Sequence, residues 1–141
     1  MKKTVMLSLR GTQRYMDQEP EIIELVTEGT LEQVENGWQL IYEETALTGL
    51  EGVTTTFMIH PGEIILSRTG KLKSEMVFRV GEMHDSLYQM EFGALMITVC
   101  ATKVDFDICE NAFGVVDLVY GIEIEHSEGG VIEYHLEIQP K

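Results

Sequence analysis

The chain has 141 residues, the length of one ordinary domain, and 44% of them are apolar, which is enough for a hydrophobic core. A wholly disordered chain is therefore excluded, and we expect residues 1–141 to form a single domain. Lys and Arg number 10 against 24 Asp and Glu. The formal charge of −14 would repel a phosphate backbone, so we expect no nucleic-acid partner.

The negative charge is unevenly placed. Between Tyr15 and Ser67 there are eleven acidic residues and no Lys or Arg, and from Val104 to Pro140 there are nine acidic residues and again no Lys or Arg. We interpret these stretches as a solvated, acidic outer surface. The alternative is a docking face for a basic protein partner or a divalent cation.

Apolar and polar residues alternate along most of the chain, as in Val5, Leu7 and Leu9 near the N-terminus. A period of two predicts strands with one buried face, and no segment has a convincing helical pattern. Turn signals separate ten expected strands, near residues 4–16, 21–35, 38–47, 53–60, 63–69, 74–81, 86–92, 95–108, 115–127 and 131–139. Short connections join antiparallel neighbours, which leaves a barrel or a sandwich. We favour an all-β fold, a single antiparallel up-and-down barrel of eight to ten strands.

Two hairpins have a predicted register. Asn36-Gly37 is a strong signal for a two-residue turn, which would place Glu35 opposite Trp38 and Leu31 opposite Tyr42.

In the last hairpin, a two-residue loop at Gly129-Gly130 would set Glu125 opposite Tyr134. A solvent-exposed face would then be paired with a buried face. A three-residue loop, residues 128–130, instead pairs Ile124 with Tyr134, and we prefer it because a slip by one residue inverts a face. This register also sets Glu125 against Glu133.

The sequence holds few signs of catalysis. It has no Gly-x-Ser-x-Gly, Cys-x-x-Cys, phosphate-binding or His-Glu-x-x-His motif, and His126 and His135 are expected on opposite faces of their strands. Cys100 and Cys109 alone make neither a disulfide framework nor a zinc site. We therefore expect no catalytic residues, no metal and no cofactor, and regard an enzyme as the less favoured class. With no signal-peptide core or membrane-length apolar run, we expect a cytoplasmic protein without a membrane partner.

One strand departs from the alternation. Arg68 shares a face with Ile64 and Leu66, and if that face is inward a guanidinium enters the barrel and needs acceptors. Glu44 would then point inward too, which suggests an Arg68–Glu44 pair with tyrosine hydroxyls nearby. The alternative is that Ile65 and Ser67 face inward, which leaves Arg68 outside.

Several short motifs are similar to those of one family. They are Tyr42-Glu43-Glu44, Thr54-Thr55-Thr56, Arg68-x-Gly70, Met76-x-Phe78, Tyr88, Phe92-Gly93 and Thr98. With them, the chain resembles the YwiB-like family of small bacterial proteins of unknown function. The resemblance implies a calycin-like barrel, related in shape to lipocalins, and a bacterial cytoplasmic setting. Where a Thr-Pro-Tyr-Gly run is expected, this chain has Met90-Glu91-Phe92-Gly93.

A barrel of this size holds either its own side chains or one small ligand. Our leading hypothesis is a non-enzymatic barrel that binds a small amphipathic or apolar molecule at an open end, through Tyr42, Glu44, Arg68, Tyr88 and Thr98. The alternative is a protein-interaction or homodimerisation module that uses its outer or acidic surface. The expected interior residues are Leu7, Leu9, Trp38, Leu40, Tyr42, Phe57, Ile59, Met76, Phe78, Ile122, Ile124, Tyr134 and Leu136.

Overall fold

The structure is a computed structural model that describes residues 2–15, 18–45 and 50–141. The described residues form ten β-strands and no helix, which confirms the predicted all-β class. The strands are β1 (Lys2–Tyr15), β2 (Glu21–Val34), β3 (Gly37–Glu43), β4 (Val53–His60), β5 (Glu63–Gly70), β6 (Ser74–Phe78), β7 (Met83–Met90), β8 (Gly93–Ile108), β9 (Gly114–Ile124) and β10 (Ser127–Pro140).

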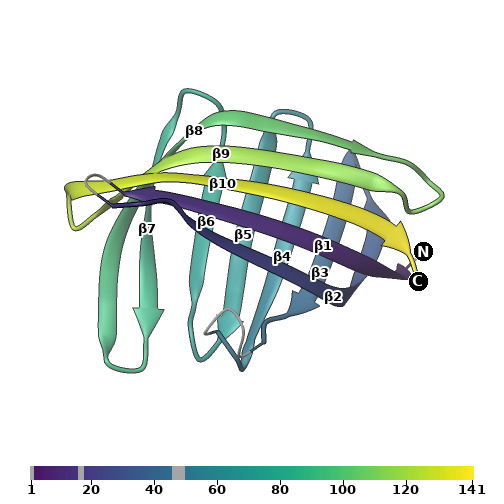
Figure 1. Ribbon diagram of the computed structural model, residues 1–141, viewed down its shortest axis with the longest axis horizontal. Helices are drawn as coiled ribbons and strands as arrows, with labels where there is room; N and C mark the ends of the chain where they lie inside the picture. The colour runs from purple at the N-terminus through teal and green to yellow at the C-terminus, as the bar shows by residue number, and fades with distance from the viewer. Residues whose placement is uncertain (1, 16–17, 46–49) are drawn as a thin grey trace.

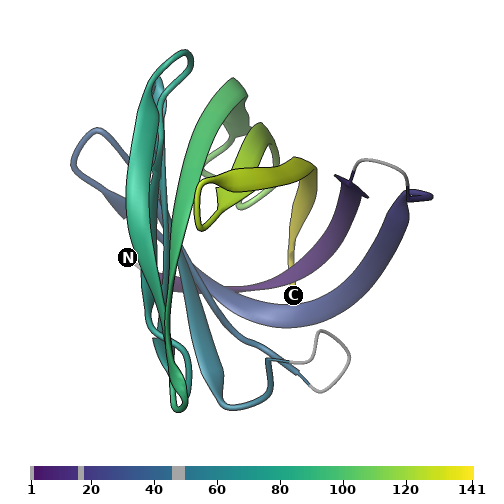
Figure 2. The same cartoon turned by 90° about the vertical axis from the view of Figure 1, so that its left-hand side faces the viewer.

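The strands form one sheet in the order β6-β5-β4-β3-β2-β1-β10-β9-β8-β7, and every neighbouring pair is antiparallel. The long strands β8, β9, β10, β1 and β2 run across β3 to β6, so the barrel is flattened into two crossing walls (Figure 1). Figure 2 shows β1 and β2 curving around the interior. The predicted up-and-down barrel is therefore confirmed.

The barrel is nearly closed where its two outermost strands, β6 and β7, meet. Lys73, just before β6, exchanges two backbone hydrogen bonds with Gln89 of β7, at 2.9 and 2.8 Å. After β6, Gly81 N–H donates to the carbonyl oxygen of Ala101 in β8 at 3.0 Å. These short bridges replace a full ladder, so the β6–β7 seam is the least hydrogen-bonded part of the wall.

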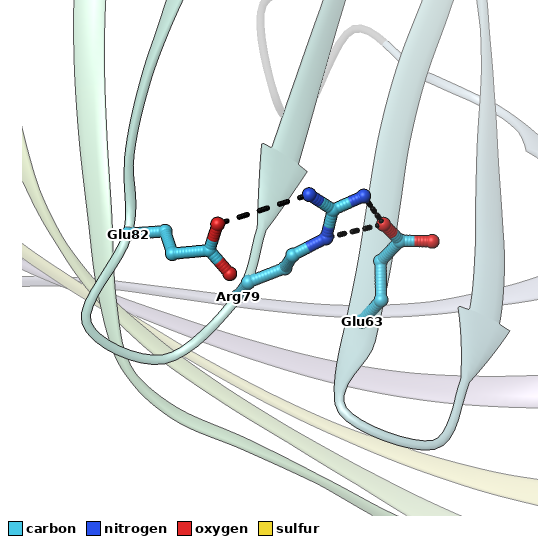
Figure 3. Close-up of polar contacts among 3 residues, drawn as sticks. All are labelled: Glu63, Arg79 and Glu82. Carbon is cyan, nitrogen blue, oxygen red and sulfur yellow. Dashed lines mark hydrogen bonds and ion pairs between the residues drawn. The ribbon is translucent and has the colours of Figure 1, made fainter.

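A surface ion-pair cluster lies at one end of this seam (Figure 3). Arg79 follows β6. Its Nε donates a hydrogen bond to Oε1 of Glu63 at 2.7 Å, and its Nη2 forms an ion pair with the same oxygen at 2.5 Å. Its Nη1 lies 3.9 Å from Glu82 Oε1. Arg79 thus ties the beginning of β5 to the turn before β7, although its 52% exposure limits the energy of the contact.

The inward faces of the strands supply the core. The expected interior residues all lie on these faces: nine are buried, and Trp38, Ile122, Ile124 and Tyr134 are half-buried. Phe57, Phe78, Leu40 and Ile59 lie outside the lining of the cavity described below, and each is at most 1% exposed. These side chains therefore form part of the packed core.

The β2–β3 hairpin turns one residue earlier than predicted. Its turn residues are Glu35 and Asn36, and Val34 pairs with Gly37, so Leu31 lies opposite Leu40 rather than Tyr42. Asn36 carries the positive φ of 61°. Gly37 is needed in the strand, because a Cβ there would lie 2.0 Å from the carbonyl oxygen of Ile59. The predicted faces survive, since the register differs by an even number of residues.

The predicted register of the last hairpin is wrong. The turn is made by Glu125 and His126, whose φ angles of 53° and 62° fit a type I′ turn. Gly129 is instead the extra residue of a β-bulge, where a Cβ would lie 2.2 Å from the carbonyl oxygen of Ile122.

Two predicted contacts change as a result. Tyr134 lies opposite Leu118, not Ile124, and Glu133 lies opposite Val119, not Glu125. The predicted like-charge pair of Glu125 with Glu133 therefore does not form. Tyr134 nevertheless faces the interior, because this displacement is also even.

Candidate functional site

One end of the barrel holds a cavity of about 340 Å³. It lies where β1, β3, β5 and β9 end and where β2, β6, β8 and β10 begin, because antiparallel neighbours bring these termini to the same edge. The lining residues are Leu9, Gly11, Gln13, Tyr15, Ile23, Tyr42, Glu44, Leu50, Arg68, Met76, Tyr88, Leu95, Ile97, Tyr120, Ile122, Ile124, Ile132 and Tyr134.

All five tyrosines of the chain line this cavity, although they come from five different strands. They are Tyr15 of β1, Tyr42 of β3, Tyr88 of β7, Tyr120 of β9 and Tyr134 of β10. A tyrosine combines a large apolar ring with one hydrogen-bonding hydroxyl, so it suits a surface that must hold both parts of an amphipathic molecule.

The register of the sheet builds a polar row across the cavity wall. Tyr42 of β3 lies opposite Thr55 of β4, Thr55 lies opposite Arg68 of β5, and Arg68 lies opposite Ser74 of β6. All four side chains are less than 9% exposed. Because facing residues in a ladder point to the same side, the row presents its polar atoms to the interior.

Glu44 follows β3 and is 6% exposed. Its backbone N–H donates to the carbonyl oxygen of Val53 at 2.8 Å, which continues the β3–β4 pairing and keeps the side chain at the cavity. The Thr55 hydroxyl donates to Oε2 of Glu44 at 2.5 Å, and the Tyr42 hydroxyl also hydrogen bonds to this carboxylate. Charge-assisted bonds of this kind stabilise a buried carboxylate.

Arg68 is 8% exposed and points inward together with Ile64 and Leu66, which selects the inward alternative for this strand. Its guanidinium hydrogen bonds to the Tyr134 hydroxyl, which in turn hydrogen bonds to Tyr120. Arg68 Nε is buried and has no hydrogen-bond partner. The two buried charged residues therefore line one cavity, each among hydroxyl groups.

Burial governs the ionisation of these groups. It raises the pKa of Tyr42 well above its ordinary value, and the nearby Glu44 carboxylate raises it further. Burial also raises the pKa of Tyr88 and of Tyr120. For Arg68, burial acts to lower the pKa, but the surrounding oxygens of Tyr134, Tyr88 and Tyr120 outweigh it, so the pKa lies above its ordinary value. At neutral pH the wall thus presents neutral Tyr42, Tyr88 and Tyr120 around a charged guanidinium.

Four of the five residues singled out from the sequence line the cavity: Tyr42, Glu44, Arg68 and Tyr88. Thr98 does not. Ile97 faces the cavity, so its neighbour in β8 faces outward, where its hydroxyl donates to Asp85 Oδ1 at 2.7 Å beside an outer groove.

Tyr15, Gln13 and Tyr120 also line the cavity and were not predicted from the sequence as site residues. Tyr120 could have been found, because it continues the alternation of Val116 and Leu118 on an inward face. Tyr15 and Gln13 occupy the same alternate positions as Leu7 and Leu9, but only the pairing of β1 with β2 and β10 shows that the end of β1 reaches the cavity.

The histidines take up separate positions. Nδ1 of His135 lies 2.7 Å from Asp117 Oδ1, and Nδ1 of His60 lies 3.0 Å from the Asn36 carbonyl oxygen. Within residues 2–15, 18–45 and 50–141, no three His, Cys, Asp or Glu side chains are grouped to hold a metal ion. The same part of the chain holds no helix that is long and apolar enough to cross a membrane.

Fold and site together define a small, nearly closed antiparallel β-barrel with a tyrosine-lined interior cavity. The sequence profile of a domain of unknown function, DUF1934, matches residues 7–138. The chain therefore belongs to the DUF1934 family.

The barrel is also similar to a solved structure, the crystal structure of ywiB protein from Bacillus subtilis. The TM-score is 0.87 at 22% sequence identity, over 99% of this chain and 93% of that chain. At this identity the likeness establishes the fold, and it agrees with the resemblance drawn from the motifs. None of the curated proteins compared matches the chain.

Proposed function

We propose that the protein is a non-catalytic binding barrel that takes one small amphipathic molecule into the cavity. The observation that carries the proposal is the gathering of all five tyrosines and two buried charged residues around about 340 Å³ of space. Ligand pockets usually have volumes of about 300–1,000 Å³ and combine an apolar lining with a few polar groups. A calycin-like barrel in a bacterial cytoplasm is the setting that we propose for it.

The two sides of the cavity differ in character. Tyr42, Glu44 and Arg68 come from β3, β5 and the segment after β3, and make one side polar. On the other side, β8, β9 and β10 contribute a set of aliphatic side chains, Leu95, Ile97, Ile122, Ile124 and Ile132. A ligand with a polar head and an apolar body matches this division, because the head can hydrogen bond to the polar side while the body packs against the aliphatic side chains.

The chemistry of the wall favours binding over catalysis. A general base must lose its proton near the operating pH, whereas Tyr42, Tyr88 and Tyr120 all have raised pKa values. At neutral pH these hydroxyls keep their protons and can both donate and accept hydrogen bonds. They therefore suit recognition of a polar head group.

Native mass spectrometry of freshly purified protein tests the proposal. We expect a bound small molecule in wild type, which Leu95→Trp should lose because an indole at this position fills the cavity. Met96→Trp is the matched control, since the neighbouring residue does not line the cavity. Failure of wild type to carry or take up any small apolar or amphipathic compound would rule the proposal out.

A second candidate is a homodimerisation module, and it is favoured by apolar side chains on the β7–β8 hairpin. Met83, Leu87 and Phe92 are 69%, 48% and 96% exposed. The proposed partner is a second copy of this chain, whose identical patch would cover these residues. Solution mass measured over a range of concentrations tests it: dimers are expected for wild type and monomers for Phe92→Ser. A monomer at every concentration would exclude this candidate.

A further inference from the structure

Two buried polar atoms in the polar row have no hydrogen-bond partner. They are Arg68 Nε and Ser74 Oγ, and their residues lie directly opposite each other in the β5–β6 register. Both residues are 8% exposed. Arg68 lines the cavity, and Ser74 lies on the inward face of β6, two residues before the cavity-lining Met76.

The missing partner must be an acceptor. A guanidinium nitrogen can only donate, and a buried donor without an acceptor is rare in native proteins because it loses its bonds to water. Arg68 also hydrogen bonds to Tyr134, so the cavity wall holds one cationic group with a free N–H, and the serine opposite it in the ladder carries an unpartnered hydroxyl. Both groups would be satisfied by one oxygen-bearing anion.

The acidic residue of the cavity comes from another part of the sheet. Glu44 follows β3, and it accepts hydrogen bonds from Thr55 of β4 and Tyr42 of β3. Arg68 and Ser74 lie on β5 and β6. The polar row is thus divided into a β3–β4 part that holds the protein's own carboxylate and a β5–β6 part that presents donors.

We propose that the ligand of this cavity carries a carboxylate head, bound by Arg68 and Ser74, and an apolar body that lies against the aliphatic side chains of β8 to β10. This inference rests on the proposed function and names the chemical class of its ligand. A carboxylate accepts several charge-assisted hydrogen bonds at once, so it matches a guanidinium with a neighbouring hydroxyl better than a neutral carbonyl does.

The cavity also bounds the size of the ligand. A cavity of roughly 150 Å³ holds one benzene molecule. At about 340 Å³, this one suits a body of about two fused rings or an alkyl chain of similar volume. Naphthoate has this size, and naphthamide is its neutral counterpart with the same shape.

Isothermal titration calorimetry with naphthoate and naphthamide tests the inference. We expect naphthoate to bind wild type about tenfold more tightly or better, because only the anion pairs with the guanidinium. Arg68→Gln should remove this preference and leave naphthamide binding within about threefold of wild type. If Arg68→Gln does not fold, the relative affinities of naphthoate and naphthamide for the wild-type protein still test whether the cavity prefers a carboxylate.

Two serine substitutions provide a second test of the inference. Ser74→Ala should weaken naphthoate binding about threefold or more, because one donor to the head group is lost. Ser67→Ala, one residue before Arg68 and on the opposite face of β5, should leave it unchanged.

The outcomes separate the two proposals. Equal binding of both compounds, or tighter binding of naphthamide, would overturn the carboxylate inference and leave the binding barrel standing. No binding of either compound, together with no co-purified molecule in native mass spectrometry, would overturn both.

Discussion

Thr55 of β4 lies directly opposite Arg68 of β5 and donates its hydroxyl to Glu44 at 2.5 Å, so one fully buried threonine neighbours both buried charged residues of the cavity. The chain also holds an exposed counterpart. Thr54, on the outer face, donates to Oε1 and Oε2 of Glu43 at 2.9 and 3.0 Å. The two contacts have the same chemistry and differ in burial, which makes them a natural comparison.

The first prediction uses this comparison. Thr55→Val keeps the shape of the side chain but leaves a buried carboxylate without one donor, and we expect a loss of about 1–3 kcal/mol in the free energy of unfolding. Thr54→Val should change it by less than about 0.5 kcal/mol, because water replaces the lost bond. Urea denaturation of both variants measures the difference, and equal effects would mean that Glu44 is solvated.

The second prediction concerns the two buried charges. Arg68→Met and Glu44→Gln should each cost about 3 kcal/mol, because each leaves the opposite charge in the same buried cavity without compensation. The double variant should cost at least ~1 kcal/mol less than the two together. The half-exposed pair of Lys141 and Glu28, 3.1 Å apart, is the control, with a coupling below about 1 kcal/mol. Additive costs for Arg68 and Glu44 would show that the two charges act independently.

The third prediction concerns alkaline pH. Burial raises the pKa of Tyr42, Tyr88 and Tyr120 above the ordinary value of 10.0, so above that pH the unfolded chain loses protons that the folded barrel keeps. Their contribution to stability is therefore complete below about pH 10 and is lost as the pH rises beyond it. Tyrosinate absorbance should appear together with unfolding, and Tyr42→Phe should make the loss less steep. Tyrosines that titrate near 10 in the folded protein would contradict the burial argument.

The fourth prediction concerns the bulge in β10. Gly129→Ala should cost about 1–3 kcal/mol or prevent folding, because the new Cβ meets the carbonyl oxygen of Ile122 at 2.2 Å. Gly121→Ala is the control, since its nearest atoms would be 3.9 Å away. Thermal unfolding compares the two variants. Equal melting temperatures would show that the backbone at Gly129 relaxes freely.

The sequence by itself determined the class of fold and the faces of the strands. Alternation of apolar and polar residues is set by the geometry of an extended backbone, so it identified ten strands and placed Phe57 and Phe78 inward without any knowledge of their partners. For the same reason, both hairpin registers could be misjudged while the faces remained right. Each error was an even number of residues, and an even displacement keeps a side chain on its side of the sheet.

Only the tertiary structure decided which side chains meet. Gly129-Gly130 has the composition of a turn, but its lack of Cβ atoms serves the close approach of Ile122 in β9 and of Arg14, which is distant in the chain. The direction of Arg68 could not be chosen locally either, because its strand presents a plausible core on both faces. The cavity itself depends on the pairing register of every strand in the sheet, because the lining residues come from many strands. Five tyrosines spread from Tyr15 to Tyr134 meet at one end because antiparallel pairing returns alternate strand ends to the same edge.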